Sequence, residues 1–360
     1  MQHRTLRRRL AFLATIACAA APAVAPSASP SLDPTPKQLE QKAKATGVPD
    51  IPYESVPNFI KMPDNLYLGE NMGVATNSKG HLFVYTRSQK TRLFEFDADG
   101  HYLRELGAGN YGFVFAHAVR VDAQDNVWVV DEGSNMVIAF DPEGRVKMVL
   151  GRRPAATEGI RESDPRGKPA SPVALPYVLD RPTDVGWDKA GNIFVADGYG
   201  NSRVVKYDKD GRFLAQTPGP GSGPGQMDLP HSIAVDRDGN VYVADRTNNR
   251  IQVFDDDLRF KAIYDQVGQP WTLCISNGPH QYLFASNSWP DNNNAVLARF
   301  TGEIYKMELD GHIVGKFGHA GKKLGEFSTT HGLDCRDPNQ IFVSEITSWR
   351  VQKLLLHPAG

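Results

Sequence analysis

The sequence predicts an all-β fold that is built from repeated units of short antiparallel strands. Two consecutive copies show the unit most clearly: RPTDVGWDKAGNIFVADGYGNSRVVKYD, which starts at Arg181, and PHSIAVDRDGNVYVADRTNNRIQVFD, which starts at Pro230. Each copy has an apolar strand, a Gly-Asn turn, an alternating strand that ends in Ala-Asp, and a third alternating strand. A repeat of about 35–50 residues with several strands per unit is typical of a β-propeller.

The first 23 residues have the pattern of a secretory signal peptide. Arginines at positions 4, 7, 8 and 9 precede an apolar run from Leu10 to Ala21 and a stretch of small residues. The run is too short for a permanent membrane span. We therefore expect cleavage near residues 20–23 and export to the periplasm or the cell exterior. The alternative is a lipid anchor at Cys18, which ends the sequence TIAC.

The charge balance of the mature chain argues against polyanionic partners. Cleavage removes four arginines and no acid, which lowers the formal net charge from −1 to −5. An acidic chain has no general attraction for nucleic acid or anionic lipid. We expect no nucleic-acid partner and no transmembrane segment, and a monomer that acts on a small molecule.

Residues 24–50 are polar and predict a tether or a short helix before the propeller, which spans residues 51–360. The propeller starts with the segment IPYESVPNFIKMPDNLYL (residues 51–68), whose prolines exclude a long helix. In a ring of blades such a leader can add the outer strand of the last blade and so hide the sheet edges. We expect this closing role here.

Six units follow the leader, and they begin at Gly73, Ala116, Arg181, Pro230, Pro270 and Thr330. An insertion rich in Pro, Arg and Glu (residues 152–179) separates the second unit from the third, and the divergent fifth unit carries the polar loop SNSWPDNNN. No segment has a sustained helical period. The expected architecture is a six-bladed β-propeller.

Two cysteines remain after cleavage, Cys274 and Cys335, and each lies in a predicted apolar strand. We expect both to be small buried side chains. An exported protein can also form disulfides, so a Cys274–Cys335 bond is the alternative.

Three histidines occupy one register in alternate units. At the start of the innermost strand, units two, four and six have His117, His231 and His331, whereas the other units have Met72, Thr183 and Trp271 or Thr272. Blades of a six-bladed ring lie about 60° apart, so alternate blades lie about 120° apart around the axis. Because innermost strands line the central channel, the three imidazoles can converge on one point.

Three converging imidazoles match a zinc site that keeps a coordination position open for water or substrate. The alternative is that each histidine caps a strand or meets a backbone carbonyl. Arg87 ends the second strand of the first unit and Tyr199 follows the second strand of the third, so both also point to a channel mouth. The alternatives are an arginine paired at the surface and a tyrosine packed on a neighbouring blade.

Three aspartates end second strands of the repeat, namely Asp131, Asp197 and Asp245. Carboxylates at such positions accept backbone N–H bonds in the turn that follows. We therefore interpret these aspartates as structural.

The repeats resemble NHL repeats. In addition, DGYGNSRVVKYDKDGRFL and GSGPGQMDLPHSIAVDRDGNVYVADRTNNRIQVF resemble the peptidyl-α-hydroxyglycine α-amidating lyases, and the resemblance extends from about residue 53 to residue 353. It implies a catalytic zinc on the three histidines, a tyrosine base at Tyr199 and an arginine near the scissile group at Arg87. The implied reaction cleaves the N–Cα bond of a C-terminal α-hydroxyglycine, or of a related carbinolamide, to give an amide and glyoxylate.

The resemblance also implies a structural calcium ion, bound through the backbone carbonyls of Val74 and Val119. An aspartate that contributes to this site in the family is replaced here by Gly332. One calcium ligand is therefore missing, and the zinc ligands are unaffected.

Two other functions fit the same fold. One is a non-catalytic exported NHL propeller that binds a peptide, protein or glycan, which would need neither metal nor Tyr199. The other is a calcium-dependent lactonase-type propeller, which would need acidic and amide side chains in the channel. The starts of the innermost strands offer His, Met and Thr instead.

Overall fold

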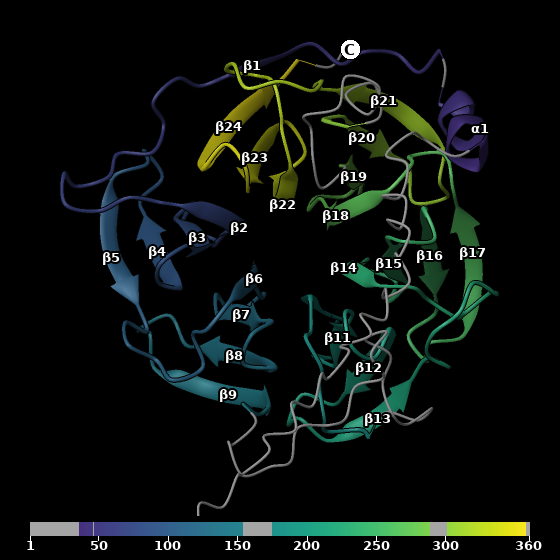
Figure 1. Cartoon of the computed structure of the whole chain (residues 1–360), viewed down its shortest axis with the longest axis horizontal. Coiled ribbons are helices and arrows are strands. Elements are labelled where there is room, and N and C mark those ends of the chain that lie inside the picture. The colour runs from purple at the N-terminus through teal and green to yellow at the C-terminus, as the bar shows by residue number, and fades with distance from the viewer. Residues whose placement is uncertain (1–35, 46, 154–174, 289–300, 358–360) are drawn as a thin grey trace, which may run out of the picture. The chain divides into compact units, whose positions relative to one another are not determined.

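The repeated units fold as four-stranded antiparallel sheets arranged around a central channel (Figure 1). The computed structural model describes residues 36–45, 47–153, 175–288 and 301–357. All of them belong to one unit, residues 33–360. The predicted signal peptide with Cys18 lies outside the described residues, as do residues 154–174 of the insertion and residues 289–300 after the start of the polar loop. The described residues confirm the six-bladed β-propeller.

Blades 1 to 3 run through the chain in order, from the innermost to the outermost strand. Their strands are β2 (Glu70–Thr76), β3 (Leu82–Arg87), β4 (Arg92–Phe96) and β5 (Tyr102–Leu106); β6 (Ala116–Val121), β7 (Val127–Asp131), β8 (Met136–Phe140) and β9 (Val146–Gly151); and β10 (Asp184–Trp187), β11 (Ile193–Asp197), β12 (Arg203–Tyr207) and β13 (Phe213–Gln216).

Blades 4 and 5 follow the same order, whereas blade 6 takes its outer strand from the start of the propeller. Their strands are β14 (Pro230–Val235), β15 (Val241–Asp245), β16 (Arg250–Phe254) and β17 (Phe260–Tyr264); β18 (Pro270–Ile275), β19 (Leu283–Asn287), β20 (Ile304–Met307) and β21 (Ile313–Phe317); and β22 (Thr330–Asp337), β23 (Gln340–Glu345), β24 (Arg350–Leu356) and β1 (Tyr53–Ser55).

The leader segment closes the ring as predicted. β1 pairs antiparallel with β24, with Tyr53 opposite Leu356 and Ser55 opposite Leu354. The Tyr53 hydroxyl also donates to the carbonyl of Gly325 at 2.6 Å. This three-residue strand covers the outer edge of β24, which would otherwise be a longer site for unwanted strand pairing.

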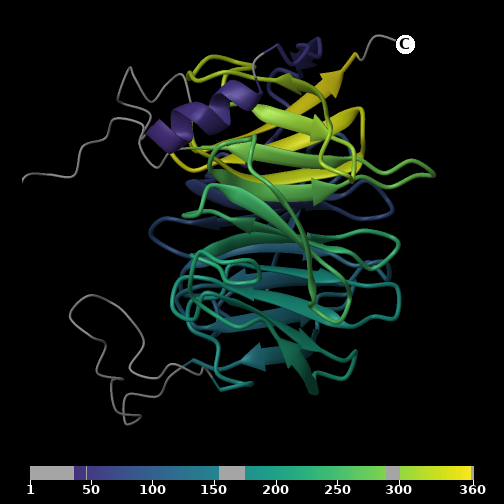
Figure 2. The ribbon, with the colours of Figure 1, turned by 90° about the vertical axis from the view of Figure 1, so that its right-hand side faces the viewer.

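The predicted tether contains one short helix, α1 (Pro36–Lys44). It lies along the outer side of the propeller (Figure 2), where the Gln41 amide donates to the carbonyl of Asn249 and Lys44 pairs with Asp265 at 2.7 Å. Among the described residues, no helix is long and apolar enough to span a bilayer.

Carboxylates at the ends of second strands fix the loops that precede the innermost strands. Asp131 accepts hydrogen bonds from the backbone N–H groups of Ser134, in the turn that follows, and of Phe115, in the loop before β6. Asp197 and Asp245 likewise accept from the backbone of Asp180 and Asp228. The predicted backbone hydrogen bond in the following turn is confirmed for Asp131, whereas Asp197 and Asp245 accept there from the side-chain amides of Asn201 and Asn248. All three carboxylates also hold the loops that lead into the channel.

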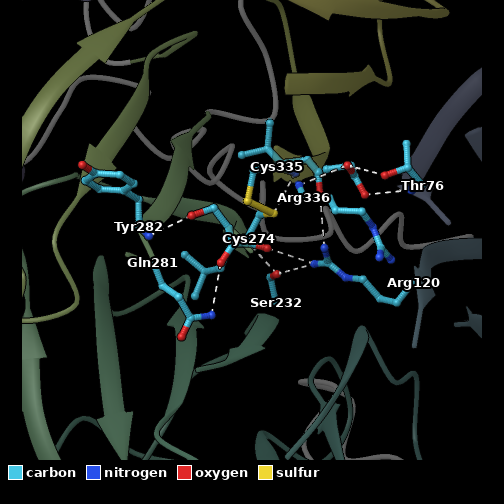
Figure 3. The surroundings of a disulfide bond; sticks show 12 residues. Thr76, Arg120, Ser232, Cys274, Gln281, Tyr282, Cys335 and Arg336 are labelled. Atoms are coloured by element: carbon cyan, nitrogen blue, oxygen red, sulfur yellow. Dashed lines mark hydrogen bonds between the residues drawn. A yellow bond between two sulfur atoms is a disulfide. The ribbon is translucent and has the colours of Figure 1, made fainter. Parts of the chain in front are cut away.

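The two cysteines form a disulfide between the innermost strands of blades 5 and 6 (Figure 3). The expectation of two separate buried thiols was therefore wrong. Cys274 on β18 and Cys335 on β22 are 61 residues apart in the sequence, yet their Cα atoms lie 5.9 Å apart because the ring brings these strands together at the channel. Such proximity across two repeats depends on tertiary structure.

Candidate metal centre

The three predicted histidines lie at β-bulges near the starts of innermost strands. In β6 the residues on either side of His117 pair with Asp131 and Val130, which are adjacent in β7, so the histidine is the extra residue. The ladders of β14 and β22 shift in the same way at His231 and His331. A bulge re-aims a side chain that regular pairing would fix. The candidate ligand nitrogens of the three histidines lie within 4.8 Å of one another.

One hydrogen bond orients each imidazole. The Nδ1 atom of each histidine lies 2.6–2.7 Å from a backbone carbonyl of the next blade, and the pairs are His117 with Thr183, His231 with Trp271, and His331 with Met72. A carbonyl only accepts hydrogen bonds, so Nδ1 carries the proton and Nε2 keeps a free lone pair in the neutral ring. Backbone carbonyls of the three odd-numbered blades therefore orient the histidines of the three even-numbered blades.

Burial keeps these imidazoles neutral. It lowers the pKa of His117 to about 3, helped by the nearby Arg87 charge and opposed by the hydrogen bond to Thr183. Burial is also the main reason that the pKa values of His231 and His331 lie well below the usual range. Neutral imidazoles can bind a metal without first losing a proton.

The donor set fits zinc. His117 Nε2 is buried and has no hydrogen-bond partner among the described residues, which is costly for a polar atom unless something else binds it. The cavity beside the histidines measures about 10 Å³, which is space for about one water-sized group. Within the described ranges, this is the one cluster of His, Cys, Asp or Glu side chains arranged to hold a metal.

Tyr199 lies beside this cluster, as its sequence position predicts. Its hydroxyl is 3.4 Å from His231 Nε2, and its ring contacts that of His117 edge to face. Burial raises the pKa of the Tyr199 hydroxyl, whereas the Arg246 guanidinium, which donates to the hydroxyl at 3.4 Å, lowers it. The phenol hydroxyl thus lies within reach of a histidine nitrogen, beside the three imidazoles.

Arg87 also lies at this mouth of the channel, where it forms ion pairs with acidic side chains. Its Nε donates to Glu70 at 2.8 Å, Nη1 lies 3.8 Å from Glu132, and the guanidinium stacks 3.7 Å from the Phe115 ring centroid. A longer bond of 3.4 Å reaches the carbonyl of Ala116, the residue before the first histidine. The surface-pairing alternative is therefore correct in part: Arg87 lies beside the site, and carboxylates share its charge.

With this geometry established, comparison with known proteins gives the family. Residues 227–254 match the NHL repeat. The NHL repeat-containing protein 3 of Mus musculus is 31% identical over 305 residues, a match that covers 80% of each chain. The chain belongs to the NHL-repeat family.

Another relative of this NHL propeller carries the name of an enzyme. The probable peptidyl-alpha-hydroxyglycine alpha-amidating lyase of Caenorhabditis elegans is 30% identical over 172 residues, which cover 41% of this chain. The match spans 44% of that lyase, less than half its length. The solved virginiamycin B lyase of Staphylococcus aureus has the same fold, with a TM-score of 0.55 at 14% identity over 86% of this chain and all of that one. This last similarity shows the fold alone.

Arg246 was not predicted from the sequence, and it lies at this mouth beside Tyr199. Besides donating to Tyr199, its guanidinium stacks 4.1 Å from the Trp271 ring centroid. Its Nε is buried and has no partner among the described residues. The sequence contained a signal for this residue. In blade 4, the residue before the bulge pairs with a residue on the second strand, and Arg246 directly follows that partner. Arg87 has the same position in blade 1.

The residues expected to bind calcium do not fit it. Val74 and Val119 line the small cavity beside the histidines, but Gly332 brings no side-chain oxygen. A Cβ at Gly332 would lie 2.9 Å from the Cα of Gly73, so the position has no room for an aspartate. The positively charged Arg120 lines the same cavity. We therefore derive no role for calcium in this chain.

Proposed function

We propose that this NHL propeller is a zinc-dependent lyase that cleaves the N–Cα bond of a C-terminal peptidyl-α-hydroxyglycine, or of a related carbinolamide, to give an amide and glyoxylate. The observation that supports this most is the convergence of three buried, neutral imidazoles whose Nδ1 atoms are all committed to backbone carbonyls. The named lyase relative supports the reaction class.

The three Nε2 atoms of His117, His231 and His331 would hold the zinc ion. Bound there, zinc would act as a Lewis acid that lowers the pKa of the substrate hydroxyl. The carbonyl partners of Nδ1 would fix the tautomer and the orientation of each ring, as partners of metal-binding histidines usually do.

Tyr199 would move the proton. Deprotonated Tyr199 would take the proton of the carbinol hydroxyl, the oxygen would form a carbonyl, and the electrons of the N–Cα bond would pass to the amide nitrogen. The same proton can then return from Tyr199 to that nitrogen, which balances the reaction without an oxidant or water. Burial raises the pKa of the Tyr199 hydroxyl, and the Arg246 charge opposes this rise, so Arg246 favours the deprotonated form relative to burial alone.

Arg246 would also bind the substrate carboxylate. Its buried Nε has no partner among the described residues, and a guanidinium binds a carboxylate with paired, charge-assisted hydrogen bonds. Arg87 has two acidic neighbours, Glu70 and Glu132, so its role would be to stabilise charge at the edge of the site. Burial raises the pKa of Glu132, an effect that the Arg87 charge opposes.

We further propose that the enzyme is exported, on the basis of the signal-peptide pattern in residues 1–23. The Cys274–Cys335 disulfide is compatible with an oxidising compartment outside the cytosol. Anchoring through Cys18 stays the alternative.

A second candidate function is a non-catalytic propeller that binds a peptide, protein or glycan. What favours it is that the relative aligned over 80% of the chain, NHL repeat-containing protein 3, has a name that states no reaction. It assigns no chemistry to Tyr199 or Arg246.

Glyoxylate release separates the two candidates. The mature protein, prepared without a polyhistidine tag and loaded with zinc, should release glyoxylate and benzamide from benzoyl-α-hydroxyglycine in equal amounts. Benzoylglycine, which lacks the hydroxyl, should give neither product. Zinc binding without release would remove the proposed substrate and keep the metal site, whereas absence of both would favour the non-catalytic propeller.

A further inference from the structure

The guanidinium of Arg120 lies in the central channel and contacts four other blades. Nε and Nη2 donate to the two carboxylate oxygens of Asp184 on blade 3, at 2.9 and 2.5 Å. Nη2 also donates to Ser232 Oγ on blade 4 and to the carbonyl of Leu273 on blade 5, both at 3.1 Å, and Nη1 donates to the carbonyl of Leu333 on blade 6 at 3.2 Å. Figure 3 shows Arg120 reaching toward Ser232 beside the disulfide. Since Arg120 itself lies on blade 2, one side chain links five blades.

These contacts join the three strands that carry the histidines. β6 contributes Arg120, β14 contributes Ser232, and β22 contributes Leu333, and each of these residues lies within three positions of the histidine on its strand. Ser232 Oγ donates in turn to Asp184 at 2.6 Å. The spacing of the histidine strands is therefore set one layer below the imidazoles by a single polar network.

Arg120 also separates two spaces in the channel. The cavity of about 10 Å³ beside the histidines and a cavity of about 390 Å³ on the far side both have Arg120 in their lining. The larger space is lined by Cys274 and Arg336 and by none of the histidines. The guanidinium thus lies between the histidine cluster and the larger cavity.

The acceptors around Arg120 are those that a hard divalent cation would take. A carboxylate, a hydroxyl and two backbone carbonyls are oxygen ligands of the kind that bind calcium. Here a guanidinium provides the positive charge, and its planar fork of donors matches a carboxylate better than the point charge of a lysine does. The Arg120 side chain thus provides in this layer the positive charge that a bound metal cation would otherwise provide.

We propose that Arg120 is a positioning residue for the metal centre: it is a permanent cation in the layer below the imidazoles, and it fixes the spacing of the three histidine strands where a structural divalent cation could otherwise bind. The effect on zinc affinity rests on the proposed zinc centre. The replacement of a divalent cation rests on the contacts of Arg120 alone.

Arg120→Ser tests the positioning role, and Arg350→Ser is the matched control. Arg350 is also largely buried, pairs with Glu345 and donates to the carbonyls of Lys322 and Glu326, but it lies at the start of β24 away from the channel lining. Both variants lose a buried pair, so both should melt about 5–10 °C lower. Only Arg120→Ser should also weaken zinc binding, by about 10–100-fold. Native zinc affinity in Arg120→Ser would overturn the positioning role.

Calcium tests the replacement of a divalent cation. In Arg120→Ser the Asp184 carboxylate, Ser232 and the two carbonyls lose their cation, so millimolar calcium should restore part of the lost Tm. Calcium should leave the Tm of the native protein and of Arg350→Ser unchanged. If calcium raises the Tm of neither variant, or raises the Tm of both variants equally, this part of the proposal is contradicted.

The outcomes also separate this proposal from the proposed function. A native protein that binds no zinc, together with an Arg120→Ser variant that calcium stabilises, would remove the zinc lyase and keep Arg120 as a permanent cation in the layer below the imidazoles. Arg120→Lys provides a second test if Arg120→Ser does not fold, since it keeps the charge and loses the planar fork. Its zinc affinity should lie below that of the native protein, and an equal affinity would contradict the positioning role.

Discussion

At the scale of single residues, the proposed metal chemistry of this propeller depends on one hydrogen bond per imidazole. Each Nδ1 donates to a carbonyl of the next blade, which leaves each Nε2 lone pair available at the axis. The histidines lie at bulges and contribute no regular pairing to the sheets. Metal binding and folding are therefore separable by mutation.

His231→Ala should abolish stoichiometric zinc binding while the protein stays folded, because it removes a ligand and leaves the β14–β15 ladder intact. Metal analysis of the purified variant, with a thermal melt followed by circular dichroism, measures both properties. His312→Ala, at an exposed turn, is the control and should keep its zinc. Full zinc occupancy in His231→Ala would show that the site is assigned to the wrong residues.

Tyr199→Phe should bind zinc as the native protein does and release glyoxylate about 10²–10⁴-fold more slowly, the usual loss for a group that transfers a proton in the transition state. Single-turnover kinetics with benzoyl-α-hydroxyglycine measure this step. Tyr111→Phe, whose ring is exposed, should react at the native rate. A native rate for Tyr199→Phe would mean that another group moves the proton.

Arg246→Gln should move the pH dependence of turnover to higher pH and raise KM. Burial raises the pKa of Tyr199 and the Arg246 charge lowers it, so removal of this charge leaves the pKa higher still. In the proposed mechanism the deprotonated phenol is the active form, so its fraction at any given pH falls and the rising limb of kcat shifts upward in pH. A rising limb at the same pH in the native protein and in Arg246→Gln would separate Arg246 from the ionisation of Tyr199.

At the scale of elements, the sequence analysis predicted the blades better than the details at their ends. Period-two alternation recurs in the units and Gly-containing turns recur in the first five, so the innermost strands and the alternating register of the histidines were predictable. The bulge at each histidine was not, because one extra residue leaves the composition and the alternation almost unchanged. Arg246 could have been found from its register with Arg87, whereas the reach of Arg120 across the channel depends on tertiary structure.

The closing strand β1 supports a prediction about stability. A chain that begins at Pro57 lacks β1 and leaves the edge of β24 open, so it should melt several degrees lower and self-associate. A chain that begins at Gly47 lacks α1 and keeps β1, and it should stay monomeric. Sizing chromatography with thermal melts measures both effects, and equal behaviour of the two truncations would contradict the closing role.

At the scale of the whole molecule, the site is a product of the six-fold ring. Even-numbered blades provide the imidazoles, odd-numbered blades provide the carbonyls that orient them, and blades 3 and 4 provide Tyr199 and Arg246. No blade holds more than one of the three histidines, so an incomplete ring cannot form the site. Histidines occur in every second repeat of the sequence, and in the folded ring they are therefore arranged with approximate three-fold symmetry around the axis.

Zinc titration of the metal-free protein tests the central claim most directly. Glyoxylate release from benzoyl-α-hydroxyglycine should rise linearly with added zinc and reach a plateau at about one zinc per chain, since one set of three imidazoles binds one ion. The same titration of His231→Ala should stay at baseline. Release that is independent of zinc, or zinc uptake that never produces release, would contradict the account.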